Sequence, residues 1–579
     1  MGFFVLWEAG RSADATGRFA GAAAKSGFTK TRQFELGKLR LMLFGNQTGN
    51  EPACFEQQNG DFIAVLGSLI YRGTRSPDCL PDLLDRFEPD SHDWRGFIGT
   101  HVVLIRKGGV VRIFGDGLGA CKIYSDQRGG VWSSSFLAMC EITAPSAFDV
   151  QACYEYVING TVSGHRSLIE GISCLPANTV LSVTDNAIGL DQRPSPIENR
   201  DLFERLTLDQ AAEYHCRQLD AVFGPIAENF GDRIRLSFSG GFDSRLMLAM
   251  LIKHGARPTL FVYGNQDDED VQIARLITDA EGLPLEHIDK SRVPACDPDA
   301  FIGETEKNLF AFDGWKVETP LFDFGADRCD RAKRHLDGQV PLNGSLGEIY
   351  RNFFYMPDGR SSTGAVISTF YSRYDRKAFT DRFQEDEYRS ALATAMREAI
   401  GSQSDRLARS QVEELYPKFR GRFWSGRDAQ INQHFGPMFF PYLEHVAVSN
   451  TPKIPIRFKD FGYLQGRMIG LVNARIAGYP SDYGFPLDGP RPLKYRLKTF
   501  LGTQRPPFLR KHSFSLTHRT KEKRDGPLSA AYLSNVIDME FPIMRSLFKL
   551  DAINSASQYG IIATLEYLGE RYNLRVPGD

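Results

Sequence analysis

The sequence contains no long hydrophobic run and no excess of charge of one sign. None of its 579 residues lies in a stretch of about 18 uncharged apolar residues, the length that a membrane-spanning helix requires. Its 69 Lys and Arg nearly balance its 71 Asp and Glu, so no overall positive field favours nucleic acid. The first residues, MGFFVLWEAGRSADATGR, lack the basic start and long apolar core of a secretory signal. We therefore expect a cytoplasmic protein with neither nucleic acid nor a membrane as partner.

Cysteines are few and irregularly spaced. The nine cysteines form no Cys-x-x-Cys pair, and residues 330–579 contain none. An odd number without regular spacing argues against a disulfide framework and against a zinc site. The eleven histidines form no close pair of ligands either. This usage is typical of a compartment that keeps thiols reduced, which again favours the cytoplasm.

The chain divides into two parts of different character. Between Gly60 and Val183, short apolar runs alternate with turn residues, and IRKGGVVRIFG predicts a hairpin with a Gly-Gly turn. We expect this part to be rich in β-structure, with one helix over 150–157. Residues 185–201 contain two prolines and no hydrophobic period, which predicts a linker. The predicted domains are therefore 1–190 and 205–579.

Strands and helices alternate after the predicted linker. The hydrophobic spacing predicts helices over 208–230, 243–254 and 269–281, and strands over 234–239, 259–264 and 284–289. Such alternation indicates βαβ units and a parallel sheet. The helix over 243–254 is apolar nearly all round, so we expect it to be buried. From Leu407 onward we expect mixed helix and loop, including a basic, mobile loop at HRTKEKRDG.

The hexapeptide SGGFDS joins an apolar strand to this apolar helix. Free N–H groups and the helix dipole at such a turn favour an anion, and Gly240 and Gly241 let a phosphate approach the backbone. Ser239 and Ser244 add hydroxyl donors. Asp243 repels phosphate but can hold Mg²⁺ beside it. The spacing matches neither GxxxxGK[ST] nor GxGxxG. The alternative is a tight strand–helix turn with a capping Asp.

SGGFDS resembles the PP-loop of ATP pyrophosphatases, which cleave ATP between its α and β phosphates and adenylate a substrate. Two further segments resemble asparagine synthetases. TLFVYGNQDDED resembles the unit whose strand end contacts adenine through its backbone, here Tyr263 and Gly264. PLNGSLGEIYRNFFY resembles the S-G-E-G-x-D-E segment; it places Asn343 and Gly344 on the Ser-Gly pair and Glu348 on the metal-binding Asp.

The resemblance to asparagine synthetases covers most of the chain. FGDGLGACKIYSDQRGGVWSSSFLAM is similar to part of their glutaminase domain, and FFPYLEHVAV is similar to their PFLD segment. It implies an α/β protein of two domains. The N-terminal one is an Ntn-hydrolase-like, β-rich α/β sandwich, and the C-terminal one is a parallel-sheet PP-loop synthetase domain with helical additions.

The same resemblance implies ATP and Mg²⁺ as cofactors and assigns the site residues. Asp243 and Glu348 are the implied catalytic residues and metal ligands. The residues that it assigns to nucleotide binding are Phe238, Ser239, Gly240, Gly241, Asp243, Ser244, Tyr263, Asn343 and Gly344. Without the resemblance, Glu348 is also compatible with an exposed residue at the start of a helix. The Tyr263 side chain is likewise compatible with a place in the core.

The sequence departs from the family at the glutaminase nucleophile. A glutaminase of this kind needs a cysteine directly after the initiator methionine, with its freed α-amine as base. Here Gly2 follows Met1, and the first cysteine is Cys54. We therefore expect no release of ammonia from glutamine.

Two further departures concern the synthetase half. Ser345 stands where related enzymes carry a Glu or a Tyr that assists the amine, and a neutral Ser is a poor general base. The lysine that steadies the pyrophosphate in the family has no clear counterpart, because Arg475, Lys494 and Lys498 all lie in the right region without aligning.

These features favour an ATP-dependent amide ligase that receives its amine without a glutaminase. Lasso-peptide macrolactam synthetases and β-lactam synthetases resemble this pattern, since a tethered amine supplies effective molarity. The first hypothesis is a lasso-type cyclase, which implies a peptide substrate and a partner maturation protease. The second is an amide synthetase on a small molecule with a carboxylate and an amine, or an ammonia-dependent asparagine synthetase. A non-catalytic nucleotide-binding protein is the third.

Other candidate residues lie near the late family motif. His434, Glu444 and His445 are candidates there, although such residues more often belong to the surface or the core. RFWSGRDAQINQHFG is compatible with a peptide-binding surface or with a helical packing segment.

Overall fold

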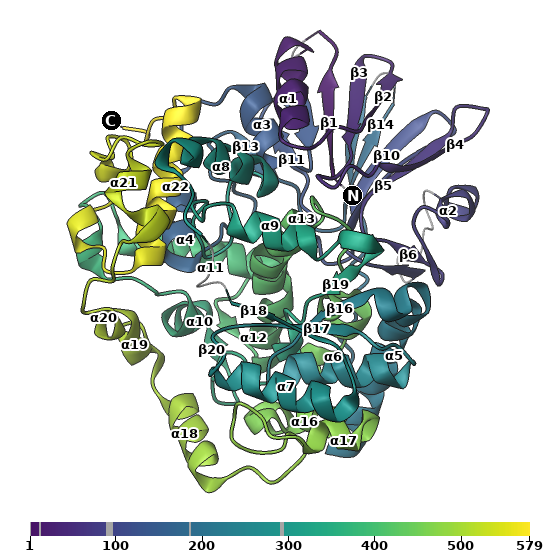
Figure 1. The fold of residues 1–579 in the computed structure, drawn as a ribbon, viewed down its shortest axis with the longest axis vertical. Coiled ribbons are helices and arrows are strands. Elements are labelled where there is room, and N and C mark those ends of the chain that lie inside the picture. Colours follow the sequence, from purple (N-terminus) through teal and green to yellow (C-terminus); the bar gives the residue numbers. More distant parts are fainter. Residues whose placement is uncertain (1, 11–12, 89–95, 185–186, 290–293, 579) are drawn as a thin grey trace.

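Two six-stranded antiparallel sheets face each other in the N-terminal part of the chain (Figure 1). The computed structural model describes residues 2–10, 13–88, 96–184, 187–289 and 294–578. The first sheet has the order β13 (Ile172–Cys174), β11 (Tyr124–Asp126), β12 (Val131–Ser133), β1 (Phe3–Glu8), β3 (Leu39–Phe44) and β2 (Thr31–Leu36). The second has the order β15 (Ile188–Gln192), β14 (Thr179–Val183), β10 (Val110–Gly115), β9 (His101–Lys107), β5 (Phe62–Gly67) and β4 (Ala53–Glu56).

The side-chain alternation of β1 explains how these sheets are covered. Phe4 and Leu6 point between the two sheets, where they join one buried cluster. Phe3, Val5 and Trp7 point the other way, into a second cluster. That outer face is covered by α1 (Ala13–Lys25) and α3 (Phe136–Thr143), and α2 (Leu80–Arg86) covers the second sheet. Because both faces of β1 are buried, its sequence from Phe3 to Trp7 is apolar without interruption.

The predicted hairpin is confirmed, whereas the predicted linker is partly wrong. β9 and β10 pair with Gly108 and Gly109 between them, both at positive φ as a tight hairpin turn requires. Within the expected linker, residues 188–192 form the edge strand β15 on β14. All five residues of β15 are exposed. A strand without a buried face carries no hydrophobic alternation, so its sequence resembles a loop.

A four-stranded parallel sheet forms the second centre of the molecule, as the alternation predicts. Its order is β18 (Leu285–Ile288), β17 (Thr259–Tyr263), β16 (Ile234–Ser237) and β19 (Val340–Leu342). The chain runs from β16 outward to β18 and then returns to place β19 on the other side of β16. The strand order therefore reverses between β16 and β19, where parallel α/β sheets bind their ligands.

The helices around the parallel sheet begin and end close to the predicted residues. α5 (Leu208–Phe230) and α7 (Glu269–Glu281) match the prediction, and α6 (Phe242–Lys253) differs by one residue at each end. α6 is buried from Phe242 to Leu251 except at Asp243, which confirms its predicted burial. In the N-terminal part, the predicted helix is α4 (Val150–Asn159).

The rest of the chain consists mainly of helices and loops, and after residue 407 this is the expected mixture. Small sheets are formed by β6 (Ile70–Tyr71), β7 (Thr74–Arg75) and β8 (Phe97–Ile98), and by β20 (Ser361–Ser362) and β21 (Arg406–Leu407). The remaining α-helices are α8 (Pro298–Ala311), α9 (Ala326–Lys333), α10 (Thr363–Phe370), α11 (Glu385–Ile400), α12 (Arg409–Leu415), α13 (Gly426–Asn432), α14 (His445–Val448), α15 (Ile456–Lys459), α16 (Tyr463–Val472), α17 (Ala474–Gly478), α18 (Leu493–Gln504), α19 (Pro507–Arg510), α20 (Ser513–Thr517), α21 (Ala530–Leu533) and α22 (Ala556–Tyr572). In the part of the chain that the structure describes, no helix combines the length and apolarity needed to cross a bilayer.

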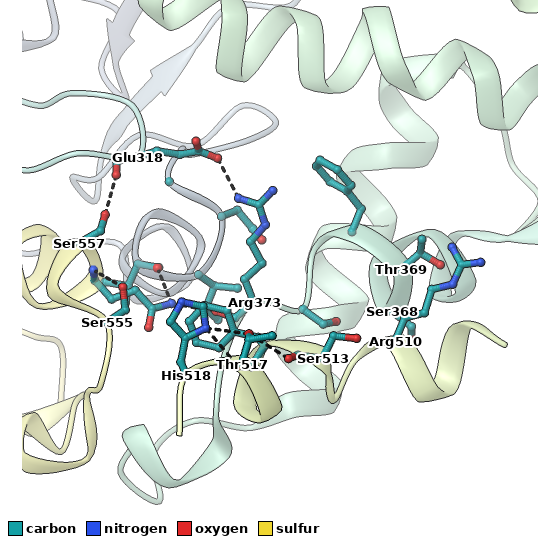
Figure 2. A pocket seen from close by; sticks show the side chains of 18 of the residues that line it. Glu318, Ser368, Thr369, Arg373, Arg510, Ser513, Thr517, His518, Ser555 and Ser557 are labelled. Atoms are coloured by element: carbon teal, nitrogen blue, oxygen red, sulfur yellow. Dashed lines mark hydrogen bonds and ion pairs between the residues drawn. The ribbon is translucent and has the colours of Figure 1, made fainter. Parts of the chain in front are cut away.

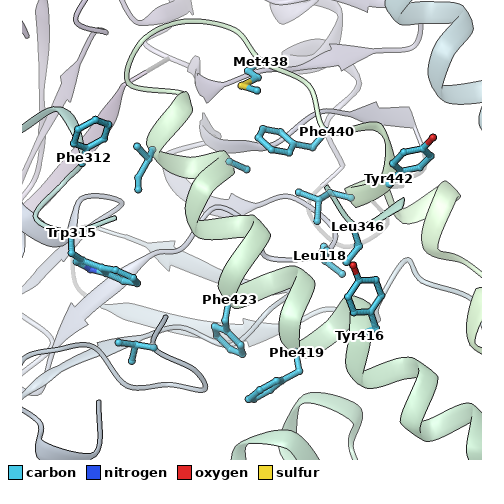
Figure 3. Packing of buried hydrophobic residues seen from close by; sticks show 14 of the residues in the cluster. Leu118, Phe312, Trp315, Leu346, Tyr416, Phe419, Phe423, Met438, Phe440 and Tyr442 are labelled. Atoms are coloured by element: carbon cyan, nitrogen blue, oxygen red, sulfur yellow. The ribbon is translucent and has the colours of Figure 1, made fainter. Parts of the chain in front are cut away.

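A buried helical segment connects the two sheet regions. Residues 416–425 are π-helical and continue into α13, and Phe419 and Phe423 pack among buried aromatic side chains there (Figure 3). The hydrophobic cluster around them extends without a break from β1 to α22. The segment RFWSGRDAQINQHFG is thus a buried packing helix, and the alternative of a peptide-binding surface is wrong.

Glu444 is buried against residues 99–116 of the N-terminal part of the chain. Its carboxylate accepts a hydrogen bond of 2.9 Å from the Gly99 amide and shares a small cavity with His101, Asp116 and His445. Burial raises the pKa of Glu444 to about 8, and the nearby Asp116 carboxylate adds to this. Glu444 therefore joins the two halves of the molecule, and it is best accommodated there in its protonated form.

Glu444→Gln is expected to flatten the dependence of stability on pH. A carboxyl whose pKa is raised in the folded state stabilises the protein below its unfolded pKa, and this stabilisation is lost as pH rises through about 8. Between pH 5 and pH 9 the wild type should therefore lose on the order of 4 kcal/mol that the variant keeps, as measured by urea unfolding at each pH. Equal losses in both proteins would contradict this role of Glu444.

Candidate active site at the carboxyl ends of β16 and β19

The SGGFDS loop lies at the edge of the parallel sheet where its strands end. It follows β16 directly, and the segment Asn343 to Glu348 follows β19, the neighbouring strand. Asp243 lies in the first turn of α6, and Glu348 lies in the 3₁₀ turn Gly347–Tyr350. Residues about 100 positions apart in the sequence are thereby brought to the same point, because β19 pairs with β16 in parallel.

Arg351 joins the two predicted metal ligands. Its Nη2 atom lies 2.6 Å from Asp243 Oδ2 and 3.6 Å from Glu348 Oε1. The sequence analysis missed this residue, although Glu348 and Arg351 stand three positions apart and lie in the quoted segment PLNGSLGEIYRNFFY. An acidic and a basic residue at that spacing in a helical turn are the signal that could have found it.

Several buried polar groups hold the two carboxylates in place. Gln465 Nε2 donates to Asp243 Oδ1 at 2.8 Å, and Tyr416 Oη donates to Glu348 Oε2 at 2.7 Å. Burial raises the pKa of Asp243 to about 7; Arg351 acts against this shift and the Glu348 charge adds to it. Near neutral pH a cation beside Asp243 therefore favours its charged form.

The donor set of this site fits Mg²⁺. The Asp243 and Glu348 carboxylates supply hard oxygen ligands, and Mg²⁺ is commonly held by one or two carboxylates together with substrate phosphates. Gln465 Oε1 is buried and has no hydrogen-bond partner among the described residues, so it offers a third oxygen nearby. No group of three or more His, Cys, Asp or Glu suited to a metal occurs in the described ranges. A bound ion there would depend on phosphate oxygens and would compete with Arg351 for the carboxylates.

Gly347 lies so close to Asp243 that only a residue without a side chain fits there. A Cβ atom at this position would lie 2.3 Å from Asp243 Oδ1. A methyl group cannot occupy that space unless the carboxylate moves. The backbone of the segment after β19 therefore packs directly against the proposed metal ligand.

Gly347→Ala is expected to lower ATP–pyrophosphate exchange, the activity that the resemblance implies, about 100-fold, because a displacement of about 1 Å in a reacting group has an effect of that order. Gly303→Ala in α8 is the matched control, since a Cβ there meets nothing within 4 Å. Both variants should keep the wild-type circular dichroism spectrum. Exchange by Gly347→Ala at the wild-type rate would show that the position of Asp243 does not matter.

The loop is held together by its own hydroxyl groups. Ser244 Oγ donates to the Ser239 carbonyl at 2.8 Å and accepts from the Ser239 amide at 3.2 Å. The preceding Phe238 amide donates to Phe261 on the neighbouring strand at 2.9 Å. The Gly240 amide donates to Asp270 Oδ1 at 2.8 Å. The Gly240 amide of the glycine turn thus already donates to the Asp270 carboxylate.

The segment that follows α17 covers the loop. Arg245 is fully buried and donates to the carbonyl groups of Tyr479, at 2.8 Å, and Pro480, which holds this segment in place. The Asp482 amide lies 3.2 Å from the position of a Cβ on Gly240, and its carboxylate lies 3.9 Å from the corresponding position on Gly241. Burial raises the pKa of Asp482 to about 6, and the Asp270 charge adds to this. The sequence analysis missed Asp482 as well.

None of the three basic residues considered for the missing lysine, Arg475, Lys494 and Lys498, contacts the loop among the described interactions. Arg475 on α17 pairs with Glu281 at 2.8 Å, and Lys494 and Lys498 are exposed on α18. Arg351 is the cation that the structure places at the carboxylates. The position of a basic residue in the sequence therefore does not indicate whether it reaches the carboxylates, because that depends on how the helices pack on the sheet.

The other predicted nucleotide residues lie around the same edge of the sheet. The Tyr263 side chain turns towards α9, where its hydroxyl donates to Asp330 at 2.7 Å, and the carbonyl of Gly264 lies 2.7 Å from His287 Nε2. Asn343 Oδ1 accepts from the Ser345 amide at 2.8 Å.

Ser345 contacts only another hydroxyl among the described side-chain hydrogen bonds. Its Oγ lies 2.9 Å from Ser425 Oγ. Gly344, beside it, packs closely on Met247. The described contacts of Ser345 thus include no basic group.

The remaining candidates lie away from the loop. His434 is buried against Phe3 and Phe28 of the N-terminal part, and Glu444 and His445 lie at the small cavity described above. None of these three residues contacts the SGGFDS loop in the described interactions, so they do not contribute to this site directly.

The structure leaves no room for a side chain at position 2. Gly2 has φ of +110°, and a Cβ there would lie 2.0 Å from the Phe44 carbonyl oxygen. Burial raises the pKa of Cys54 and holds those of Cys121 and Cys140 well above the usual value. A protonated thiol is a weak nucleophile. A cysteine in place of Gly2 would require the first strand to move.

Two cavities adjoin each other, and the smaller one is lined by Glu348. A cavity of about 280 Å³ is lined by Glu348 and Arg351 and by several aromatic side chains. A larger one of about 660 Å³ shares Tyr355 and Phe370 with it and lies between α4, α10, α20 and α22. Figure 2 shows the hydroxyl groups and the Arg373 side chain that line the larger cavity.

Comparisons with known proteins assign no family. No protein-family model matches the sequence, and no curated protein matches it. Among solved structures, the chain is similar to a glutamine phosphoribosylpyrophosphate amidotransferase from B. subtilis, complexed with ADP and GMP, at 11% identity and a TM-score of 0.22. That match covers 50% of this chain and 65% of the amidotransferase. A structure described as the allosteric regulatory enzyme of purine biosynthesis matches at 9% identity and a TM-score of 0.24, over 52% of this chain and 82% of that one. At such TM-scores neither likeness extends to this chain's fold or activity.

Proposed function

We propose that the protein is an ATP-dependent, AMP-forming amide ligase, which adenylates a substrate carboxylate and joins it to an amine. The observation that carries this proposal is the meeting of Asp243 and Glu348, bridged by Arg351, at the point where the order of the parallel strands reverses. The SGGFDS loop opens α6 at the same place and supplies backbone N–H groups for an anion.

The proposed reaction has two steps. A substrate carboxylate oxygen attacks the α-phosphorus of ATP, the bond to the β-phosphate oxygen breaks, and pyrophosphate leaves. An amine nitrogen then attacks the acyl carbon, AMP leaves, and the amine proton passes to a base. Arg351 and the loop N–H groups stabilise the charge on the pyrophosphate. Mg²⁺, held by Asp243 and Glu348, would neutralise phosphate charge.

Binding of a nucleotide phosphate would replace a hydrogen bond that the loop makes in the structure. The Gly240 amide donates to Asp270 in the structure, so a phosphate that takes this amide displaces the Asp270 carboxylate. Asp482, above the loop, also faces the incoming phosphates, and the elevated pKa of its carboxyl lowers its charge near pH 6. The segment that Arg245 holds over the loop must therefore adjust when ATP enters.

The size of the cavities favours a substrate larger than free aspartate. The cavity of about 280 Å³ is lined by Glu348 and Arg351, and it adjoins a cavity of about 660 Å³ that these two residues do not line. The larger cavity is in the size range of pockets that hold drug-sized ligands. A peptide whose own N-terminal amine closes a ring, as in lasso-type macrolactam synthetases, is our first choice of substrate. A small molecule with a carboxylate and an amine is the second.

ATP–pyrophosphate exchange with Mg²⁺ tests the proposal. One reaction contains free aspartate and ammonia, and the other contains a peptide with a free N-terminus and an internal Asp or Glu, preferably one encoded beside this protein. Exchange with the peptide alone, with release of AMP and loss of one water from the peptide mass, supports a macrolactam synthetase. Exchange with aspartate supports an asparagine synthetase. ATP binding without exchange would favour the non-catalytic alternative.

A further inference from the structure

The helices α18, α19 and α20 form an arm, residues 493–517, that is attached to the body through the packing of α19 on α10 but buries few of its own side chains. Figure 1 shows α18 at the lower left, standing out from the body, with α19 and α20 above it. Thr503 is the single buried residue of α18, and the described α19 and α20 contain none. An ordinary surface helix buries an apolar stripe, so these helices need another reason for their composition.

The arm exposes an unusual amount of apolar surface. Seven of the fifteen large hydrophobic residues that are exposed in the described part of the chain belong to it: Leu493 79%, Leu497 55%, Phe500 52%, Leu501 60%, Phe508 64%, Leu509 45% and Leu516 52%. They come from 25 consecutive positions of a 579-residue chain. A concentration of this kind marks an interaction surface, whereas single exposed apolar residues do not.

The apolar residues of α18 form one stripe with basic residues beside it. At 3.6 residues per turn, Leu493, Leu497, Phe500 and Leu501 fall on one face of the helix. Lys494 and Lys498 fall along one edge of this stripe and Arg496 along the other, and all three are exposed. The opposite face carries Tyr495, Thr499 and Thr503, which line the cavity of about 280 Å³. The helix therefore has one face towards the cavity and one face towards solvent.

The arm and the loop after it are strongly basic. Residues 491–524 contain eleven Lys and Arg but a single acidic residue, Glu522, whereas the whole chain has a net charge of −2. The occupant of the apolar stripe must therefore also accept a dense positive charge. A second copy of the arm would bring like charges together, and a nucleic acid would leave the apolar stripe exposed.

We propose that the arm, residues 493–517, binds the surface of an anionic phospholipid bilayer. An exposed helix with Leu and Phe on one face and Lys and Arg along its edges lies in the interface of such a bilayer, with its apolar face among the acyl chains. The lipid phosphates pair with the basic residues. The expectation of no membrane partner depended on the absence of a spanning segment, and binding at the surface needs none.

The placement has a consequence for the proposed site. Because α18 presents its other face to the cavity beside Glu348 and Arg351, the bound bilayer would lie one helix away from that cavity. An amphiphilic substrate could then reach the cavity without leaving the membrane surface. Membrane binding itself does not depend on the proposed ligase activity.

Flotation of the full-length protein with lipid vesicles tests the proposal. One set of vesicles is phosphatidylcholine alone, and the other contains an equal amount of phosphatidylglycerol. The wild type should float with the second set and much less with the first, and raising the salt concentration should weaken the binding.

Two variants separate the apolar and the charged contributions. The triple substitution Leu493→Ser, Leu497→Ser and Leu501→Ser, and the triple substitution Lys494→Glu, Arg496→Glu and Lys498→Glu, should each lower binding to the anionic vesicles at least about tenfold. Leu190→Ser and Leu336→Ser, at side chains that are 56% and 58% exposed elsewhere, are controls that should bind like the wild type. The melting temperature should stay unchanged in all of them, because these side chains are exposed.

Each other outcome would overturn the proposal. If the wild type fails to float with anionic vesicles, the arm does not bind lipid. If binding persists in both triple variants, another surface is responsible. If the leucine variant instead converts a dimer to a monomer in light scattering, and no vesicle binds, a second copy of the chain is the occupant.

Discussion

Asp243→Asn is expected to lower ATP–pyrophosphate exchange at least about a thousandfold, which corresponds to on the order of 4 kcal/mol of transition-state stabilisation. The amide keeps the shape of the side chain but carries no charge for Mg²⁺ or for Arg351, whose Nη2 lies 2.6 Å away. Exchange measured with radioactive pyrophosphate, at saturating ATP and with whichever substrate supports exchange by the wild type, gives the rate directly.

The fold should tolerate this substitution. Since burial already raises the pKa of Asp243 to about 7, replacing its carboxyl group removes a charge that becomes unfavourable as pH rises through that value. Because Glu348 remains 3.6 Å from Arg351, the guanidinium keeps a carboxylate partner, and the variant should unfold in urea close to the wild type at pH 8. Asp220→Asn is the control, because Asp220 pairs with Lys253 and His254 on the outside of α5 and α6. Exchange by Asp243→Asn at the wild-type rate would show that the reaction does not require the Asp243 carboxylate.

Arg427→Met is expected to have the largest effect on stability, about 3 to 5 kcal/mol. The Arg427 and Asp313 side chains are 0% and 1% exposed, and their ion pair measures 2.9 Å between Nη1 and Oδ2. Asp313 also accepts hydrogen bonds from the amides of Phe136 and Leu137 at the start of α3. Removing the guanidinium leaves a buried carboxylate without its cation at the point where α3 meets α13.

Urea unfolding followed by tryptophan fluorescence measures this loss, and Arg467→Met provides the comparison. Arg467 pairs with Asp209 at the surface, where an ion pair contributes at most about 1 kcal/mol. Arg427 stacks on Trp315, so the fluorescence should change in the same transition. A loss of less than 1 kcal/mol in Arg427→Met would mean that water replaces the guanidinium and that the pair does not hold α3 against α13.

Local patterns allowed much of the fold to be predicted. The hydrophobic period of 208–230 and 269–281 gave α5 and α7 with correct ends, and the Gly-Gly turn gave the β9–β10 hairpin. Strand β15 was missed because none of its five residues is buried. Where an element has no buried face, its sequence contains no signal of the structure it adopts.

The candidate site was predicted in part and completed by distant residues. The SGGFDS loop and Asp243 could be found because that motif is local, and Glu348 was assigned through the resemblance of PLNGSLGEIYRNFFY to asparagine synthetases. Arg351, Gln465, Tyr416 and the covering Asp482 were missed, since their importance depends on which strands lie side by side.

The sequence by itself determined that a strand, a glycine turn and a buried helix follow one another at 234–253, because backbone conformation and hydrophobic period are set by neighbouring residues. Only the tertiary structure decided that β19 pairs with β16, so that Glu348 and Arg351 meet Asp243 at one edge of the sheet. It alone decided, too, that an exposed basic arm stands beside the adjoining cavity. The physical reason is that strand order and helix docking minimise the free energy of the whole core, and no short segment contains that information.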